Sequence, residues 1–120
     1  MKVLTVKLMP WKWQGLVFVG GLVDEYRAAI KRDIGADASV GSNSAGHAYV
    51  EYGKPFAIWV ESLKDVPCLA HEALHVTNGI LEARGLKPTS ESEEAYTYTM
   101  EDILKQVLDA KPSAWRTVRR

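Results

Sequence analysis

Cysteine is almost missing from this sequence, because Cys68 is the only one among 120 residues. A single cysteine excludes a disulfide within the chain, so the fold has to be stabilised by a hydrophobic core. Long apolar runs are missing as well, and no stretch approaches the roughly 18 residues of a membrane-spanning helix. Residues 1–8 alternate instead of forming the apolar run of a secretory signal peptide. We therefore expect a cytoplasmic protein that has no contact with a membrane.

An excess of either charge is also missing. Fifteen lysine and arginine residues balance fifteen aspartate and glutamate residues, so the formal net charge is zero. Domains that bind nucleic acid usually carry a basic excess, and the balance here argues against a nucleic-acid partner. Hydrophobic residues make up 47% of the chain, which at this length is typical of one domain with one core. We expect that domain to span residues 1–112, followed by a basic C-terminal tail, residues 113–120.

The residues most typical of a chemical function are His71-Glu72-Ala73-Leu74-His75, which include two of the three histidines. On a helix, residues four apart lie on the same face, so both imidazoles can bind one zinc ion. Glu72 is rotated away from the two rings and can act as general base on a metal-bound water. The flanking residues are mostly apolar, which predicts a buried helix in which polar groups need partners. Gly79 in this helix would allow another element to approach closely.

Two histidines are too few for a catalytic zinc ion, which usually has three protein ligands and one open position. A second helix is predicted to start at the acidic residues 91–94. Ser90 and Glu93 have the spacing of a capping box, which would use the Glu93 side chain. Glu91, at the first helical position, is expected to face solvent. Glu94 is therefore the expected third ligand, with Glu93 as the alternative.

The two histidines and Glu72, with a glutamate on the next helix, resemble the gluzincin branch of the zincin metallopeptidases. More narrowly, the chain resembles small zinc peptidases encoded by phages and prophages. In these, a short αβ region with a hairpin precedes the H-E-x-x-H helix, and a following helix carries a motif like Glu94-Ala95-Tyr96-Thr97-Tyr98. The resemblance covers residues 46–109 with useful specificity and residues 1–45 only in general layout.

One position departs from the family. Thermolysin-like enzymes place an acid four residues after the glutamate ligand, where it supports a histidine, and Tyr98 stands at that position here. The support would have to come from Tyr98, Glu101 or Asn78, or it is missing.

The resemblance implies zinc-dependent hydrolysis of peptide bonds, with a peptide or protein as the substrate. His71, His75 and Glu94 would hold Zn²⁺, and Glu72 would take the proton of the attacking water. Tyr98, one helical turn after Glu94, is the candidate donor to the oxyanion that forms. The resemblance also implies that a substrate strand pairs with the edge of the hairpin, at Pro55 to Glu61.

Two other hypotheses stay open. The chain could use zinc only to fix a small fold, although such sites usually have four ligands and are rich in cysteine. It could also be a phage-encoded structural or host-interaction protein without catalytic turnover, located in the host cytoplasm.

The apolar pattern predicts an α+β domain in the order strand, helix, hairpin, helix, helix. His47 falls in the hairpin, either as a surface residue or as a ligand or oxyanion donor. With the resemblance, this gives a minimal zincin-like fold. A small antiparallel sheet with the hairpin packs on the histidine helix, and that helix packs antiparallel on the Glu94 helix and meets it at the metal. The expected segments are a strand at 3–8, a short extended piece at 16–19, helices at 22–34, 67–85 (capped by Asp65) and 91–110, and hairpin strands at 46–52 and 55–61.

Overall fold

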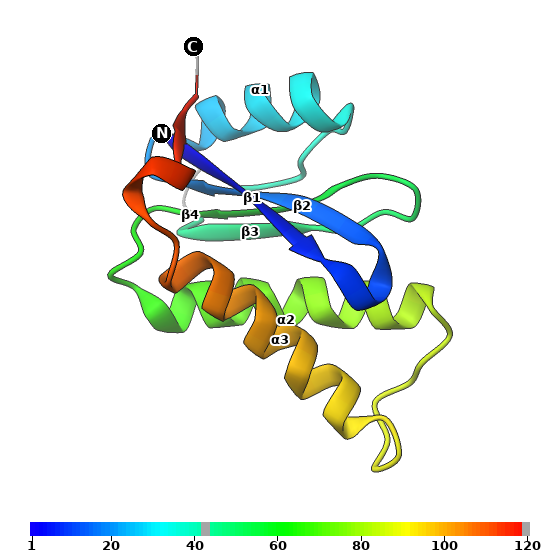
Figure 1. Ribbon diagram of the computed structural model, residues 1–120. Helices are drawn as coiled ribbons and strands as arrows, with labels where there is room; N and C mark the ends of the chain where they lie inside the picture. The colour runs from blue at the N-terminus through cyan, green and yellow to red at the C-terminus, as the bar shows by residue number, and fades with distance from the viewer. Residues whose placement is uncertain (42–43, 119–120) are drawn as a thin grey trace.

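The computed structural model describes residues 1–41 and 44–118, and in this part of the chain helices cover both faces of a five-stranded sheet (Figure 1). Helix α1 lies on one face, and helices α2 and α3 lie on the other. The strands are β1 (Lys2–Leu8), β2 (Trp13–Val19), β3 (Gly46–Tyr49), β4 (Phe56–Val60) and β5 (Arg116–Thr117). The helices are α1 (Val23–Ile34), α2 (Val66–Ala83) and α3 (Glu93–Leu108), and short 3-10 helices cover Met9–Trp11 and Pro112–Ala114. The α+β class is confirmed.

The sheet is mixed, with the strand order β3-β4-β2-β1-β5. β1 and β2 form one antiparallel hairpin, β3 and β4 form the predicted hairpin, and β2 runs parallel to β4. Parallel neighbours need a crossover connection, and α1 lies in it. The expectation of a purely antiparallel sheet is therefore wrong. The apolar pattern of the β3–β4 hairpin does not show which other strand will pair with the free side of β4.

The expected tail is partly in the sheet. β5 pairs with β1, with Lys2 opposite Thr117 and Val3 opposite Arg116. Residues 119–120 of the tail lie outside the described residues.

The alternation of apolar residues sorts the core into two layers. Leu4, Val6 and Leu8 pack on the side of α2 and α3, whereas Val3 and Phe18 pack against α1. Successive side chains of a strand point to opposite faces, so the alternation in residues 3–8 is sufficient to predict which of these residues share a layer. All five residues of β4 are buried, as expected for a strand with helices on both sides.

Both ends of α2 follow local rules. The Asp65 carboxylate accepts a hydrogen bond from the Cys68 backbone N–H at 3.1 Å, which confirms the predicted cap. After the last turn, Gly85 has a φ of 78°, in the left-handed region that favours glycine at a helix end.

The start of α3 differs from the prediction. The helix begins at Glu93 and not at Glu91, so the capping box of Ser90 with Glu93 is wrong. The hydroxyl of Ser92, the residue before the helix, donates to the Lys87 carbonyl. That hydrogen bond closes a turn, in which Ser90 and Glu91 lie before the first helical residue.

The two flanks of α2 have different neighbours. α3 runs back across α2 and contacts both α2 and β1 (Figure 1). β3 also contacts α2 but lies at the opposite edge of the sheet from β5, separated from β1 by β4 and β2. α3 and β3 therefore lie on different flanks of α2. In residues 1–41 and 44–118, no helix has the length and apolar character needed to cross a bilayer.

Candidate metal centre

Three potential metal ligands come together on α2. His71, Glu72 and His75 offer ligand atoms that all lie within 4.8 Å of one another, and they are the one such group among residues 1–41 and 44–118. The Nε2 atoms of His71 and His75 are 3.2 Å apart. Their rings are nearly perpendicular, with an interplanar angle of 77°. Both histidines are exposed, whereas Glu72 is only 6% exposed.

The spacing of the two ring nitrogens fits a zinc ion. Two nitrogen ligands at about 2.0–2.1 Å from zinc, at a tetrahedral angle, are about 3.3–3.4 Å apart. The observed 3.2 Å is close to this value. The same distance suits a hydrogen bond between one N–H and the other ring nitrogen, so the geometry permits both states. Imidazole is a donor that zinc accepts well, so the two histidines fit two ligand positions of Zn²⁺. With Glu72 as the base, a third ligand has still to be assigned.

Glu72 is buried because β3 lies directly against α2. A Cβ atom on Gly46 would be 2.8 Å from the Cys68 sulfur and 3.0 Å from Glu72 Oε2. Farther along, a Cβ on Gly79 would be 2.8 Å from Cβ of Val50. Neither glycine could carry a side chain unless one element or the side chains that it meets moved, so the two glycines allow strand and helix to approach closely. The expectation that Gly79 admits a close neighbour is confirmed.

Burial controls the electrostatics of this group. Burial raises the pKa of the Glu72 carboxyl above its ordinary value, and the nearby His71 and His75 oppose that rise. A raised pKa makes a carboxylate a better proton acceptor near neutral pH. The arrangement is therefore suited to a general base, which is the role expected from the sequence.

The third histidine is at the same site. A cavity of about 640 Å³ lies between α2 and β3, and its lining includes His47, His71 and His75. The Tyr26 hydroxyl and Nδ1 of His47 are 2.8 Å apart. Burial, followed by the charge of His75, lowers the pKa of His47. Burial also raises the pKa of Tyr26, which is fully enclosed and keeps its proton.

Other polar residues of the cavity follow the helical period. Asn78 and Glu82 line it together with His71 and His75, at spacings of four, three and four residues. These spacings place all four on one face of α2. The period was readable from the sequence, but the face that the helix would expose was not.

The structure does not bring Glu94 or Tyr98 to the histidines. Both are exposed on α3, with Tyr98 62% exposed, and neither lines the cavity. The reason is that α3 packs on the β1 side of α2, where Ile103 and Val107 enter the core. The expected meeting of the two helices at the metal is therefore not found in this arrangement. Among the described residues, the group of potential ligands contains no acid from α3.

Glu91 is exposed just before α3, as expected, and Glu93, the alternative ligand, is exposed at the start of α3 and does not line the cavity. The expected position of the substrate strand is wrong. The strand expected to pair with a substrate, Pro55 to Glu61, is β4, which lies between β3 and β2 and has no free edge. The free edge beside the histidines belongs to β3.

The sequence left His47 open between the surface and the site, and it did not assign Gly46, which lies opposite Glu72, or Tyr26, the partner of His47. Gly46-His47 at the start of the hairpin was the available signal, but nothing in it showed that this strand would lie on α2. Comparison of the chain with protein family models, with characterised proteins and with solved structures gives no significant match. The interpretation of the site therefore rests on its own geometry.

Proposed function

We propose that this protein is a zinc-dependent hydrolase that cleaves peptide bonds. One observation carries the proposal: two imidazole nitrogens 3.2 Å apart lie beside a nearly buried carboxylate, in a cavity along the free edge of a sheet. The nitrogens have the spacing for one metal ion, the carboxylate can move a proton, and the edge can bind an extended peptide.

The residues of α2 divide the chemistry between them. His71 and His75 would hold Zn²⁺ through their Nε2 atoms, and the bound ion would polarise the substrate carbonyl and lower the pKa of water. The Glu72 carboxylate takes a proton from the attacking water and later gives it to the leaving amine. Burial, which raises the pKa of Glu72, makes it a stronger base for the first of these steps.

β3 provides the place for the substrate backbone. Its outer edge is unpaired in the sheet, so an extended peptide can add to it by backbone hydrogen bonds. Gly46 and Ala48 are small and line the cavity, which leaves room for the peptide beside Glu72.

His47 replaces Tyr98 as the donor to the oxyanion in this proposal. Because the Tyr26 hydroxyl keeps its proton, it can donate to Nδ1 of His47, and the imidazole then carries its own proton on Nε2. A positioned N–H of this kind stabilises the negative charge that develops on a carbonyl oxygen.

The test uses Glu72→Gln, which keeps the size of the side chain and removes its basicity. Hydrolysis of unfolded, carboxymethylated proteins should be sensitive to chelator in the wild type. It should fall about 10²–10⁴-fold in the variant, the usual effect of losing a general base. Zinc content, measured on the same samples, should be unchanged. Glu91→Gln, at an exposed position before α3, is the matched control and should match the wild type in both measurements.

Two outcomes would contradict the proposal. If Glu72→Gln loses the metal, the carboxylate is a ligand and its assignment as base is wrong. If zinc binds stoichiometrically but no chelator-sensitive cleavage occurs, the chain is a zinc-binding protein without turnover.

The third ligand can be assigned by comparing zinc affinities. His47→Ala, Glu82→Ala and Glu94→Ala remove one potential ligand each, the first two from the cavity and the third from α3. The present geometry predicts that Glu94→Ala binds zinc like the wild type. A strong loss in that variant would mean that α3 moves onto the site when metal binds.

A further inference from the structure

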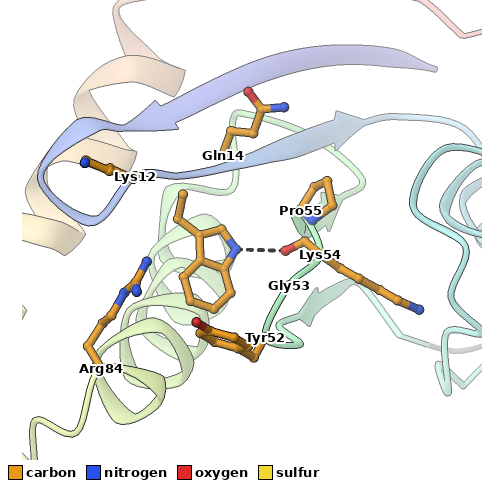
Figure 2. A pocket seen from close by; sticks show the side chains of 8 residues that line it. Lys12, Gln14, Tyr52, Gly53, Lys54, Pro55 and Arg84 are labelled. Atoms are coloured by element: carbon orange, nitrogen blue, oxygen red, sulfur yellow. Dashed lines mark hydrogen bonds between the residues drawn. The ribbon is translucent and has the colours of Figure 1, made fainter.

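A second cavity, of about 380 Å³, lies between the C-terminal end of α2, the β1–β2 connection and the β3–β4 turn (Figure 2). Its size is within the range of small-molecule sites. Three basic side chains, Lys12, Lys54 and Arg84, line it with the aromatic rings of Trp13 and Tyr52. None of its lining residues in the described part of the chain is acidic. This local excess of positive charge stands out on a chain whose formal net charge is zero.

The aromatic rings hold the arginine in place. Trp13 is 8% exposed, and its indole N–H donates to the Lys54 carbonyl at 2.9 Å. Tyr52 meets Trp13 edge-on, with 6.0 Å between the ring centroids. The guanidinium carbon of Arg84 lies 5.5 Å from the centre of Trp13 and 6.0 Å from that of Tyr52. The Arg84 guanidinium also donates a hydrogen bond from Nη2 to the Trp11 carbonyl. A guanidinium fixed in this way is prepared to bind a carboxylate with two parallel hydrogen bonds.

The basic groups are not equivalent. The Lys54 ammonium donates to the Gly35 carbonyl at 3.0 Å and pairs with Glu51 at 3.1 Å. Figure 2 shows its side chain pointing away from Arg84, on the other side of the indole from Lys12 and Arg84. Lys12 and Arg84 are therefore the charges that an anion in the cavity would meet.

This cavity is separate from the cavity of the metal centre, and among the described residues the two share no lining residue. From His75 to Arg84 the helix rises roughly 13 Å and turns through about 180°, so the two side chains leave α2 in opposite directions. Arg84 accordingly reaches the β1–β2 connection, where it binds the Trp11 carbonyl.

We propose that the cavity at Trp13, Lys12 and Arg84 is a carboxylate-binding subsite for a glutamate or aspartate side chain of a peptide. The proposal does not rest on the proposed function, because the subsite is separate from the metal centre.

Binding can be measured without hydrolysis. The probe is an acetylated, amidated hexapeptide of one glutamate followed by five alanines, added to the nitrogen-15-labelled full chain in the presence of a chelator. The Trp13 indole N–H and the Gly53 amide report on the subsite, and the Ala48 amide reports on the metal-centre cavity. The first two signals should shift, and the Ala48 signal should not. N-acetylglutamate amide alone should give the same shifts, because the side chain carries the binding.

The controls remove one charge at a time. Replacing the glutamate of the peptide by glutamine, or using Arg84→Gln, should weaken binding at least about tenfold, because either change removes one charge-assisted contact. Lys105→Gln removes the same charge on α3 and should have no effect. Circular dichroism of each variant shows whether its fold is intact.

Each result decides one part of the proposal. Equal binding of the glutamate and glutamine peptides, or wild-type binding by Arg84→Gln, overturns the subsite. Shifts of the Ala48 amide together with the Trp13 indole signal would mean that the peptide spans both cavities, and they overturn the separate subsite. Binding of the glutamate peptide by a chain that hydrolyses nothing supports the subsite and contradicts the hydrolase, so the two failures are distinguishable.

Discussion

Replacing Gly46 by alanine should disturb the candidate base and leave the two histidines in place. The new methyl group would be 2.8 Å from the Cys68 sulfur and 3.0 Å from Glu72 Oε2, whereas ordinary contacts are 3.4–4 Å. Either β3 moves away from α2, or the two side chains move. His71 and His75 are not among the atoms that the methyl group meets.

The cost can be worked out from these contacts. Overpacking of this kind destabilises by about 1–3 kcal/mol, and loss of glycine from the unfolded chain returns about 0.4–1 kcal/mol. The net loss in the free energy of unfolding is about 1–2 kcal/mol. With an unfolding entropy of about 2.1 cal/mol/K per residue, a chain of 120 residues loses about 4 °C per kcal/mol. Thermal unfolding followed by circular dichroism should show a midpoint about 4–8 °C lower.

Gly41→Ala provides the matched control, because its Cβ would make only an ordinary contact, 3.5 Å from the Ser44 hydroxyl. Its midpoint should be equal to that of the wild type or slightly higher. Adding Cys68→Ala to Gly46→Ala removes the closest contact and should recover part of the loss, as a double-mutant cycle would detect. Zinc binding should survive in Gly46→Ala while hydrolysis falls. If Gly46→Ala melts like Gly41→Ala, β3 does not press on Glu72 and the reasoning is refuted.

Three further predictions concern the metal, a cap and a histidine. Zinc at 100 times its Kd should stabilise the wild type by about 2.7 kcal/mol in urea denaturation, and equal stabilisation of His75→Ala would exclude the histidine pair. Asp65→Ala should lose about 0.5–2 kcal/mol because it removes the cap of α2, whereas Ser90→Ala should melt like the wild type. The pKa of His47 is lowered from 6.5, so the unfolded chain binds its proton more tightly. The free energy of unfolding of the metal-free protein should have its full value above pH 6.5 and decrease as the pH falls below 6.5. His47→Gln should show a smaller decrease.

The sequence determined the features that depend on residues close together in the chain. The spacing of His71 and His75 brings the two ring nitrogens together on any helix, so the candidate ligands could be named without a fold. The same holds for the Asp65 cap and for Gly35, whose φ of 76° ends α1. The hairpin of β3 and β4 was predictable because its strands are joined by a short turn.

Only the tertiary structure decided which elements lie beside α2. Helix periodicity shows that α3 has an apolar face, but it does not show on which flank of α2 that face will pack. Packing on the β1 side took Glu94 away from the histidines, and the parallel pairing of β2 with β4 left β3 as the free edge. The tertiary structure also placed His47 at the cavity and the Arg84 guanidinium over the Trp13 ring. These contacts join residues far apart in the chain, and their free energy comes from the whole core and not from any local pattern.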